Sequence, residues 1–594
     1  MDSNAGKINA TNYLNNMKDE ELGPLQTNFQ SKQNIPMPSQ NKSALLLENL
    51  TISKKSKVIV KSISFEAKFG EITAIMGPSG SGKTSVLRYL ANIRSFSLSY
   101  SGKKILLGAF KYVGQEDHLH GFFTTDTYLN NQFGLNYGFV EWGSFEQRDI
   151  LKNNIISSLQ LTKAKHTKVG DIFIQGLSGG EKRRLSVALE LVSKPSLLIL
   201  DEPTSGLDSF AAEKVIESLH NLALKENIAV VLTIHQPSSK IFKMIDNVAL
   251  LREGELMFFG PPNQVDQFFI KNEQVEKPHY NPADQCLEIL SEEAPIKKCD
   301  YMPCATIAEM EKLLKENSLN PVSYHKKANF LEKFLFLTYR NFKNLFMNPF
   351  ILIVRIVMYI MLCFMVGAMF WDVGGRYNEE SVIARSSVLF YVDAFLVFMS
   401  IAAVPAFMME RAIIEKELRN KLYHPWTFQL SYWFSSWLGV FLIAIISTLF
   451  VVLMCSLRRF GIFLVNLFLS LLIAEGLAFL TALLVPHYII AMALISGLYG
   501  MFMICCGFFI VYNDIPPWFI WGYYMAFHSY SFRIFMYNEF KDINVLVDST
   551  FQSGQDVLDF YSMGDVNVGD NLVILMGYVL ALQILTAIIM KLKY

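Results

Sequence analysis

The sequence of 594 residues predicts two fold classes in succession, an α/β domain and then an all-α membrane domain of six helices. Strands and helices alternate around a glycine-rich loop at 77–84, which is typical of a mostly parallel sheet. Beyond residue 349, six apolar stretches each approach the roughly 20 residues that a helix needs to cross a bilayer. A 52% share of apolar residues supports a membrane protein, and the net charge of zero gives no reason to expect a nucleic acid partner.

The amino-terminal 43 residues predict a disordered cytosolic tail. They are polar and lack the charged start and apolar core of a signal peptide. The seven cysteines of the chain are odd in number and scattered, without a pair of C-x-x-C units. They therefore indicate reduced, structural thiols and neither a zinc site nor a disulfide framework.

The glycine-rich loop has the context of a phosphate-binding P-loop, because it follows the apolar run 72–76 and precedes a helical stretch at 85–91. Backbone N–H groups of such a loop and the start of its helix bind phosphates. Lys83 would then reach the β- and γ-phosphates, and the Thr84 hydroxyl would ligate Mg²⁺. Taken alone, the pattern also fits a chance match or any other P-loop enzyme. The loop consists of Gly77, Pro78, Ser79, Gly80, Ser81, Gly82, Lys83 and Thr84.

A β-hairpin and a further strand are predicted on either side of this loop. Apolar or alternating runs at 45–52 and 58–65 flank the basic turn 54–57, which indicates a hairpin that leads into the strand before the loop. The stretch 105–113 reads as one strand, and it ends at the polar break 114–117.

Two carboxylates follow a buried strand later in the domain. The four apolar residues 197–200 run straight into Asp201 and Glu202, the arrangement of a Walker B segment. Asp201 would hold Mg²⁺ through water, and Glu202 would polarise the attacking water. The next apolar strand, 229–234, ends in His235. Because parallel strands end at one edge of a sheet, we expect these side chains to lie together there.

The remaining pieces have plain structural interpretations when each is taken alone. Gln115 fits an ordinary turn residue, Asp208 a helix N-cap, and His235 a satisfied histidine at a strand end. Their order and spacing favour one nucleotide-binding domain instead. In chain order the pieces are the P-loop, Gln115, Leu177-Ser178-Gly179-Gly180-Glu181 opening a helix at 182–191, Leu-Ile-Leu-Asp-Glu ending at Glu202, Ser-Gly-Leu-Asp ending at Asp208, and Thr-Ile-His ending at His235.

On these motifs, residues 44–275 resemble the nucleotide-binding domain of ABC transporters, and Leu177 to Glu181 match its signature motif. The resemblance implies a RecA-like core with antiparallel β and helical subdomains. It also implies that ATP with Mg²⁺ is held between the P-loop of one domain and the signature of a second. Ser178, Gly179 and Gly180 would then contact the γ-phosphate in trans, as a helix N-terminus can.

The same resemblance assigns roles to the other motif residues. Gln115 would contact Mg²⁺ and relay its presence to the membrane part, and Asp208 would support the dimer contact. The catalytic set that it implies is Lys83, Gln115, Glu202 and His235. One feature departs from the common pattern, because residues 44–64 contain no aromatic side chain to stack on adenine.

A charged, turn-rich linker is predicted at 276–329, and an amphipathic helix follows at 330–348. A plain soluble helix is the alternative, but the apolar run directly after it favours a helix at the membrane surface. The apolar side of this helix is predicted to carry Phe334, Leu337, Phe342 and Leu345, and the polar side Lys333, Arg340 and Lys343.

The membrane domain, 349–594, is predicted to have both ends in the cytosol because the number of spans is even. Basic residues before the first span, between the second and third, and at the tail support this orientation, although Arg458 and Arg459 oppose it locally. An outer loop is predicted at 513–570. The six spans are 350–371, 387–407, 432–455, 461–485, 488–512 and 571–590.

A nucleotide-binding domain placed before a single six-helix membrane domain resembles the G subfamily of ABC transporters, the white/brown-complex half transporters. This resemblance implies a homodimer or heterodimer in the plasma membrane that exports a hydrophobic or amphipathic small molecule or lipid. It also implies that the loop 410–423 touches the nucleotide domain. The alternatives are a non-transporting regulatory ATPase, a structural partner in a heterodimer, and a nutrient importer.

The family's ligand cavity lies between the second and fifth spans, where this chain offers Phe390, Asp393, Phe395, Phe502 and Phe509. Aromatic residues in spans also pack or face lipid, so a structural role is the alternative for each. Asp393, like Glu475 in the fourth span, is costly in a membrane unless it faces protein or water. Both carboxylates therefore predict either a functional role or a buried pair with a basic or hydroxyl partner.

Overall fold

The computed structural model describes residues 42–594 apart from 56, 94–96, 139–144, 172–173, 272–280, 292–297, 299–300, 302, 304, 320–327 and 545–550. The predicted tail up to residue 41, Cys299, Cys304 and several stretches of the linker lie outside the described residues. The chain divides into two compact units. Unit 1 is Met1–Phe110, Pro195–Pro203 and Ile216–Asn320, and unit 2 is Lys111–Lys194, Thr204–Val215 and Pro321–Tyr594.

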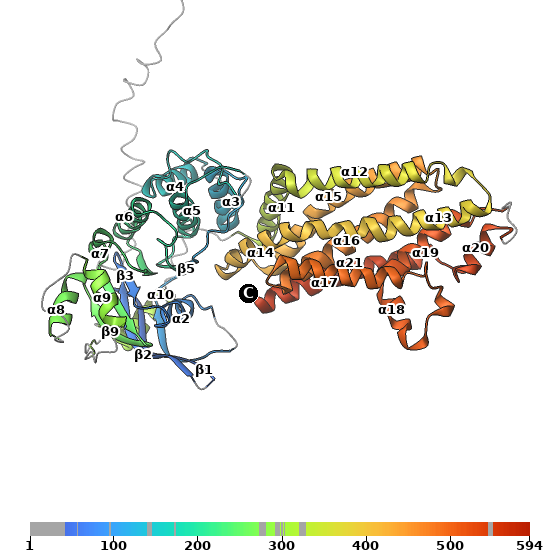
Figure 1. Ribbon diagram of the computed structural model, residues 1–594. Coiled ribbons are helices and arrows are strands. Elements are labelled where there is room, and N and C mark those ends of the chain that lie inside the picture. The colour runs from blue at the N-terminus through green and yellow to red at the C-terminus, as the bar shows by residue number, and fades with distance from the viewer. Residues whose placement is uncertain are drawn as a thin grey trace, which may run out of the picture. The chain divides into compact units, whose positions relative to one another are not determined.

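The main sheet of unit 1 confirms the predicted parallel α/β core (Figure 1). Its strands follow the order β6-β7-β3-β8-β9, and only the last pair within that run is antiparallel. Every residue of β3, β6 and β7 is buried, which explains their nearly uninterrupted apolar sequence. The bounds are β3 Ile72–Met76, β6 Leu197–Leu200, β7 Ala229–Thr233, β8 Asn247–Arg252 and β9 Glu255–Gly260.

The predicted hairpin is also confirmed, since β1 (Ser43–Lys54) and β2 (Lys57–Lys68) pair antiparallel. The single strand predicted at 105–113 is wrong. That stretch contains the end of β4 (Ser99–Leu106), which pairs with β1, and then β5 (Phe110–Val113), which is not part of the β2-β1-β4 sheet. Gly108 breaks the run with φ 96, a backbone conformation that residues with side chains rarely adopt.

Helices complete the nucleotide-binding part of the chain. The predicted helix after the P-loop is α2 (Lys83–Leu90), and the one after the signature is α5 (Gly179–Leu191). The segment predicted as a linker also contains two helices, α9 (Pro282–Ser291) and α10 (Ile307–Leu319). The other helices of this region are α3 Thr125–Tyr137, α4 Phe145–Ser158, α6 Ser209–Glu226, α7 Ser239–Lys243, η2 Pro262–Gln264 and α8 Val265–Lys271.

In unit 2, five helical stretches among the described residues are long and apolar enough to cross a membrane. The predicted fifth span, 488–512, is the shorter helix α17 (Tyr488–Ile504), which ends before Gly507 with φ 97. Helices α12, α15, α16 and α21 run side by side (Figure 1). The five stretches are Leu352–Gly375, Glu380–Arg419, Pro425–Met454, Phe460–Leu484 and Val568–Lys593. The helices themselves are α12 Pro349–Met369, α15 Pro425–Met454, α16 Phe460–Leu484 and α21 Val568–Lys593.

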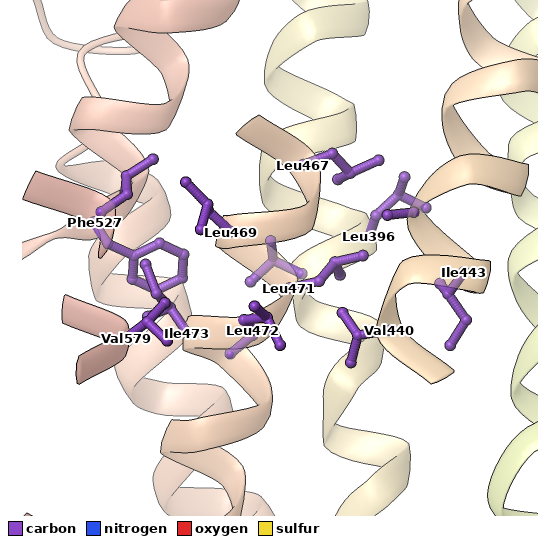
Figure 2. Packing of buried hydrophobic residues seen from close by; sticks show 14 of the residues in the cluster. Leu396, Val440, Ile443, Leu467, Leu469, Leu471, Leu472, Ile473, Phe527 and Val579 are labelled. Atoms are coloured by element: carbon purple, nitrogen blue, oxygen red, sulfur yellow. The ribbon is translucent and has the colours of Figure 1, made fainter. Parts of the chain in front are cut away.

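Helix α16 lies at the centre of this bundle. Its Leu467 and Leu471 lie toward Leu396, while Leu469 and Ile473 lie on the side of Phe527 and Val579 (Figure 2). More of its best apolar window is buried than in any other membrane-spanning stretch described, 72%. Its fully buried Asn466 donates a hydrogen bond from its side-chain amide to the backbone carbonyl oxygen of Ser531 at 2.9 Å, so this donor is paired within the protein.

The second span differs from its prediction at both ends. Its helical stretch begins with α13 (Glu379–Tyr391), passes through a π-helical turn at Val392–Leu396 and a 3₁₀ turn at Met399–Ala403, and ends with α14 (Val404–Arg419). The predicted loop 410–423 is therefore wrong for its first ten residues, which are helical. Glu, Lys, Arg and Leu are good helix formers and carry the helix beyond the apolar segment.

The predicted outer loop is largely helical in its described residues. Helix α19 (Phe527–Phe540) is almost entirely buried, packs against α16 and α21, and contributes Glu539 to an ion pair with Arg385 at 3.0 Å. The other short elements are η3 Val373–Gly375, η6 Tyr512–Asp514, η7 Pro517–Phe519, α18 Ile520–Met525 and α20 Gly554–Phe560.

Candidate functional site

The P-loop of unit 1 has the backbone geometry that phosphate binding requires. Gly77, Gly80 and Gly82 have φ values of 152, 82 and 99. A Cβ at Gly77 would lie 2.1 Å from the carbonyl oxygen of Leu251, so only glycine fits beside β8 at this point. The sequence is constrained here by backbone packing as well as by its ligand.

Lys83 is held over the loop by its own backbone. Its Nζ donates hydrogen bonds to the carbonyl oxygens of Gly77 at 2.7 Å and Pro78 at 2.9 Å. Burial lowers the pKa of Lys83, and the charges of Glu202 and Asp201 act in the opposite direction. The Ser81 hydroxyl is buried and has no hydrogen-bond partner among the described residues. A cation and an unpaired hydroxyl in one glycine-rich loop fit a polyphosphate.

The register of the sheet brings the predicted carboxylates and histidine to the same edge as this loop. Leu200 pairs with Leu232 and Ile75 with Thr233, so the strands β6, β7 and β3 end together. Asp201, Glu202 and His235 follow these ends, and His235 is exposed. This confirms the expectation that the carboxyl ends of the strands gather the polar groups in unit 1.

Thr233 connects the two carboxylates and was missed by the sequence analysis. Its Oγ1 donates to Asp201 Oδ1 at 2.8 Å and accepts from the Glu202 backbone N–H at 2.9 Å. Glu202 has φ 44, which the second bond helps to hold. A hydroxyl at the end of an otherwise apolar strand is the signal that could have identified it. The carboxylate of Asp201 and the backbone of Glu202 are therefore both held by β7.

In unit 2, the signature residues form the start of α5. Ser178 caps the helix, and the side chain of Glu181 accepts from the Ser178 backbone N–H at 2.9 Å, completing a capping box. Ser178 and Gly179 are exposed, while Leu177 is buried below them. The N-terminus of α5 thus faces solvent, with the partial positive charge that attracts anions.

Arg183 of α5 holds the segment that carries Gln115. It donates to the carbonyl oxygens of Gly114 and, at 3.4 Å, Gln115, and it forms a 3.3 Å ion pair with Asp117. Arg183 is 2% exposed, so this contact is firmly buried. Sequence patterns gave no sign of it because the partners lie 66 or more residues apart.

Asp208 has the structural role that its plainer interpretation predicts. Its Oδ1 accepts from the Ala211 backbone N–H at 2.9 Å at the start of α6, as an N-cap does. The side chain is otherwise exposed. Its predicted support of a dimer contact stays a prediction.

The short loop after α14 is hydrogen-bonded to the strand that leads to Gln115. Asn420 accepts from the Tyr112 backbone N–H at 3.0 Å and donates to the Tyr112 carbonyl oxygen at 2.9 Å. Lys111 Nζ donates to the carbonyl oxygen of Asn420 at 2.6 Å. The last turn of the second span is therefore joined directly to β5, three residues before Gln115.

A buried carboxyl of α5 lies beside the same contact. Glu190 is 4% exposed, and burial raises its pKa, while Lys416 and Lys111 act in the opposite direction. Lys416 belongs to α14, so the helix behind the signature and the end of the second span share one charged environment.

Helix α11 (Phe330–Met347) is amphipathic, but Arg340 does not lie on a polar surface as predicted. It is 2% exposed, lies on the buried side together with Leu337, and pairs with Glu417 at 2.6 Å. Tyr423 donates to the other oxygen of Glu417 at 2.6 Å. The placement of Arg340 was wrong because the buried side of the helix carries polar residues that bond with α14 and α15. Its exposed face is apolar and contains Phe330, Leu331, Leu335, Tyr339 and Phe346.

The residues predicted for the ligand cavity do not surround one described cavity. Phe390 stacks on Phe508 at 4.6 Å and meets Phe509 edge-on at 4.9 Å. Phe502 is buried against Phe527, whereas Phe395 stacks on Tyr391. Their role in ligand binding stays a prediction.

Asp393 and Glu475 both have the partners that the buried-pair alternative predicts. Asp393 is 1% exposed and accepts from the Ser531 hydroxyl at 2.5 Å. Glu475 forms a 2.8 Å ion pair with Arg355. The hydroxyl and the guanidinium offset the cost of holding these carboxylates inside the bundle.

Comparison with known proteins agrees with both halves of this description. Residues 60–205 match the family described as ABC transporter, and residues 332–540 match ABC-2 type transporter. A solved metal-chelate type ABC transporter in an inward-facing conformation matches with a TM-score of 0.32 and 24% identity, over 38% of this chain and 85% of that one.

Several relatives match along most of the chain. ABC transporter G family member 11 of Arabidopsis thaliana is 30% identical over 80% of this chain and 73% of its own length. ABC transporter G family member 1 of Petunia hybrida is 28% identical over 91% and 90%. The broad substrate specificity transporter ABCG2 of Mus musculus is 29% identical over 82% and 80%. The chain is a multi-pass membrane protein that binds nucleotide and couples ATP hydrolysis to transport, and it belongs to the G family of ABC transporters.

Proposed function

We propose that the chain is a half transporter that works as a dimer and exports a hydrophobic or amphipathic small molecule or lipid across the plasma membrane. Both termini would lie in the cytosol, where ATP is. The observation that carries the proposal is the bond between Asn420 and Tyr112, because it joins a membrane helix to the strand before Gln115. An ATPase with only a regulatory role would have no use for this connection.

The proposed nucleotide site lies at the edge of the sheet where the strands β3, β6 and β7 end. Backbone N–H groups of the P-loop and Lys83 bind the phosphates, and Thr84, Gln115 and Asp201 supply oxygen atoms of the kind that Mg²⁺ prefers. Their fit is supported by the Thr233 hydroxyl, which orients the carboxylate of Asp201. When bound, Mg²⁺ neutralises charge on the phosphates.

The remaining residues act on the water and on the γ-phosphate. Glu202 orients the attacking water and accepts its proton, while His235 donates to the γ-phosphate. Ser178, Gly179 and Gly180 of the partner subunit's α5 close the site, because that helix presents its N-terminus to solvent. Asp208 keeps its own helix start in place beside the dimer seam.

Coupling passes through the segment of Gln115. Arg183 holds its carbonyl oxygens from the signature helix, and Asn420 holds the preceding strand from the membrane side. A shift of Gln115 upon hydrolysis would therefore move β5 against the end of α14. Tightly packed and hydrogen-bonded elements transmit such a shift as rigid bodies.

Replacing Asn420 with alanine is expected to separate hydrolysis from transport. The variant loses both side-chain hydrogen bonds to Tyr112, each worth about 1 kcal/mol, so transport should fall at least about tenfold. ATP turnover should stay within about twofold because no catalytic group is touched. Turnover and flux are measured on the same purified protein. Lys421→Ala, one residue further along and exposed, is the control and should change neither; normal flux in the Asn420 variant would contradict this coupling route.

Flux into sealed vesicles tests the function itself. Purified protein is reconstituted in proteoliposomes, ATP and Mg²⁺ are added outside, and uptake of a fluorescent amphipathic dye is followed. Export predicts accumulation inside, because only outward-facing nucleotide domains see ATP. Hydrolysis without flux for any amphipathic dye would favour the regulatory ATPase, and ATP-driven loss of preloaded compound would favour the importer. A mass measurement of the intact complex tests the dimer.

A further inference from the structure

A cavity of about 70 Å³, whose largely apolar lining contains several polar and charged groups, lies within unit 2, among α11, α12, α14, α15 and α16. A buried water needs roughly 10 to 15 Å³ of such space, so the cavity could hold about five waters or one small polar group. It lies apart from the aromatic residues predicted for the ligand cavity. Its polar lining includes Asn344, Arg355, Glu410, Tyr432, Ser435 and Glu475.

One carboxylate oxygen in this cavity has no partner. Glu475 Oε1 pairs with Arg355 Nη1 at 2.8 Å, and the Glu475 residue is 6% exposed. Its Oε2 is buried and accepts no hydrogen bond from any residue that the structure describes. An unmatched carboxylate oxygen at this depth is costly, so a donor in the cavity would stabilise it.

The charges around the cavity are also one cation short. Glu410 is the second carboxylate of the lining, and it accepts a 3.3 Å hydrogen bond from the side-chain amide of Asn344. Arg340 is engaged by Glu417 at 2.6 Å. His120 lies 3.9 Å from Glu410, but burial and the charge of Arg340 lower its pKa well below the usual value, so it is neutral. Among the described side chains around the cavity, the two arginines Arg340 and Arg355 therefore face the three carboxylates of Glu410, Glu417 and Glu475.

Exposed apolar side chains stand next in sequence to several residues that line the cavity. Ser435 and Gly439 of α15 line it, while Phe434 and Leu438 beside them are exposed and apolar. On α12, Leu352 lines it and Ile353 is exposed. Helix α11, whose exposed face is apolar, contributes Asn341 and Asn344. These are the surroundings of a group at headgroup depth, where polar and apolar environments meet.

We infer that this cavity binds one primary ammonium group, which donates to Glu475 and Glu410 and comes either from an ethanolamine lipid headgroup or from a free organic amine. Three N–H donors match the unpaired carboxylate oxygen, and the positive charge supplies the missing cation. A trimethylammonium group carries the same charge but no N–H donor, so a choline headgroup cannot replace it. The inference concerns binding and does not depend on what the protein transports.

The test uses the purified full-length protein in bilayers with equal amounts of phosphatidylethanolamine and phosphatidylcholine of identical acyl chains. Lipids that stay bound after extraction are counted by native mass spectrometry. We expect retained phosphatidylethanolamine to exceed phosphatidylcholine at least about tenfold, as one good charge-assisted contact allows. In bilayers of phosphatidylcholine alone, added ethanolamine would raise the melting temperature if the source is a free amine.

Glu475→Gln keeps the shape of the side chain, removes its charge, and should abolish both effects. Glu539→Gln is the matched control, because it removes one carboxylate from another buried arginine pair, at 3.0 Å, and should change neither. If Glu475→Gln does not fold, Gly439→Leu serves as the second variant. It places a side chain at the cavity wall and leaves every charged group in place. A Cβ at Gly439 meets its nearest atom at an ordinary 3.5 Å. Equal retention of the two lipids with no thermal response to ethanolamine, or an unchanged preference in Glu475→Gln, would overturn the inference.

Discussion

Glu202→Gln is expected to slow ATP hydrolysis at least about a hundredfold while leaving ATP binding intact. Glutamine keeps the size of the side chain but cannot accept a proton from the attacking water. The backbone of residue 202 should stay in place, because Thr233 accepts the hydrogen bond from its N–H group. Binding depends on the P-loop, which this change does not touch. Turnover and nucleotide affinity are measured on the same purified preparation.

The control for this experiment is Glu226→Gln, an exposed carboxylate at the end of α6. It should hydrolyse ATP at the normal rate, which excludes a general effect of losing one negative charge. Near-normal turnover in the Glu202 variant would mean that another group activates the water. Loss of nucleotide binding would instead indicate that the charge of Glu202 helps to set the state of Lys83, on whose pKa it acts.

Arg340→Met is expected to destabilise the fold by about 3 to 5 kcal/mol. It leaves the buried carboxylate of Glu417 without its guanidinium partner, and only the hydroxyl of Tyr423 still donates to it. Because both α11 and α14 take part, the loss should appear as a lower melting temperature of the purified protein and a smaller folded fraction in gel filtration.

The double variant Arg340→Met with Glu417→Gln separates charge from packing. Removing both charges should recover much of the lost stability, since the large cost comes from the unpaired carboxylate. Lys343→Met on the same helix is the control. Its ammonium lies 5.9 Å from the Tyr339 ring and should contribute less than about 1 kcal/mol. A double variant as unstable as the single one would assign the effect to packing of the arginine side chain.

Particular errors show where pattern reading fails in this chain. Residues 105–113 look like one strand because both halves are apolar, yet Gly108 with φ 96 turns the chain between two strands. Arg340 looks like a surface residue because it is charged and lies on an amphipathic helix. Its partner is 77 positions away, and no local pattern identifies that pairing.

In the membrane domain, too, local sequence patterns predicted some features and missed others. Apolar length predicts the existence of five long spans, although not both ends of the second, because crossing a bilayer is a property of single segments. The sequence did not predict that the second span continues as a helix to Arg419, or that Asn420 is hydrogen-bonded to Tyr112. The resemblance placed a contact in that region but did not name the residue. Which residue makes this contact depends on the packing of two segments that lie more than 300 residues apart in the sequence.

Short sequence patterns were enough to identify the phosphate loop, the carboxylates behind a buried strand and the succession of spans, because glycine conformations, strand burial and bilayer thickness act on short stretches of chain. Three contacts became visible only in the folded chain: Thr233 holds the Asp201 carboxylate and the Glu202 backbone, Asn420 joins the membrane helix to the strand before Gln115, and Arg355 and Glu475 border a cavity. These contacts join side chains from distant segments, and such encounters are set by how whole helices and strands pack.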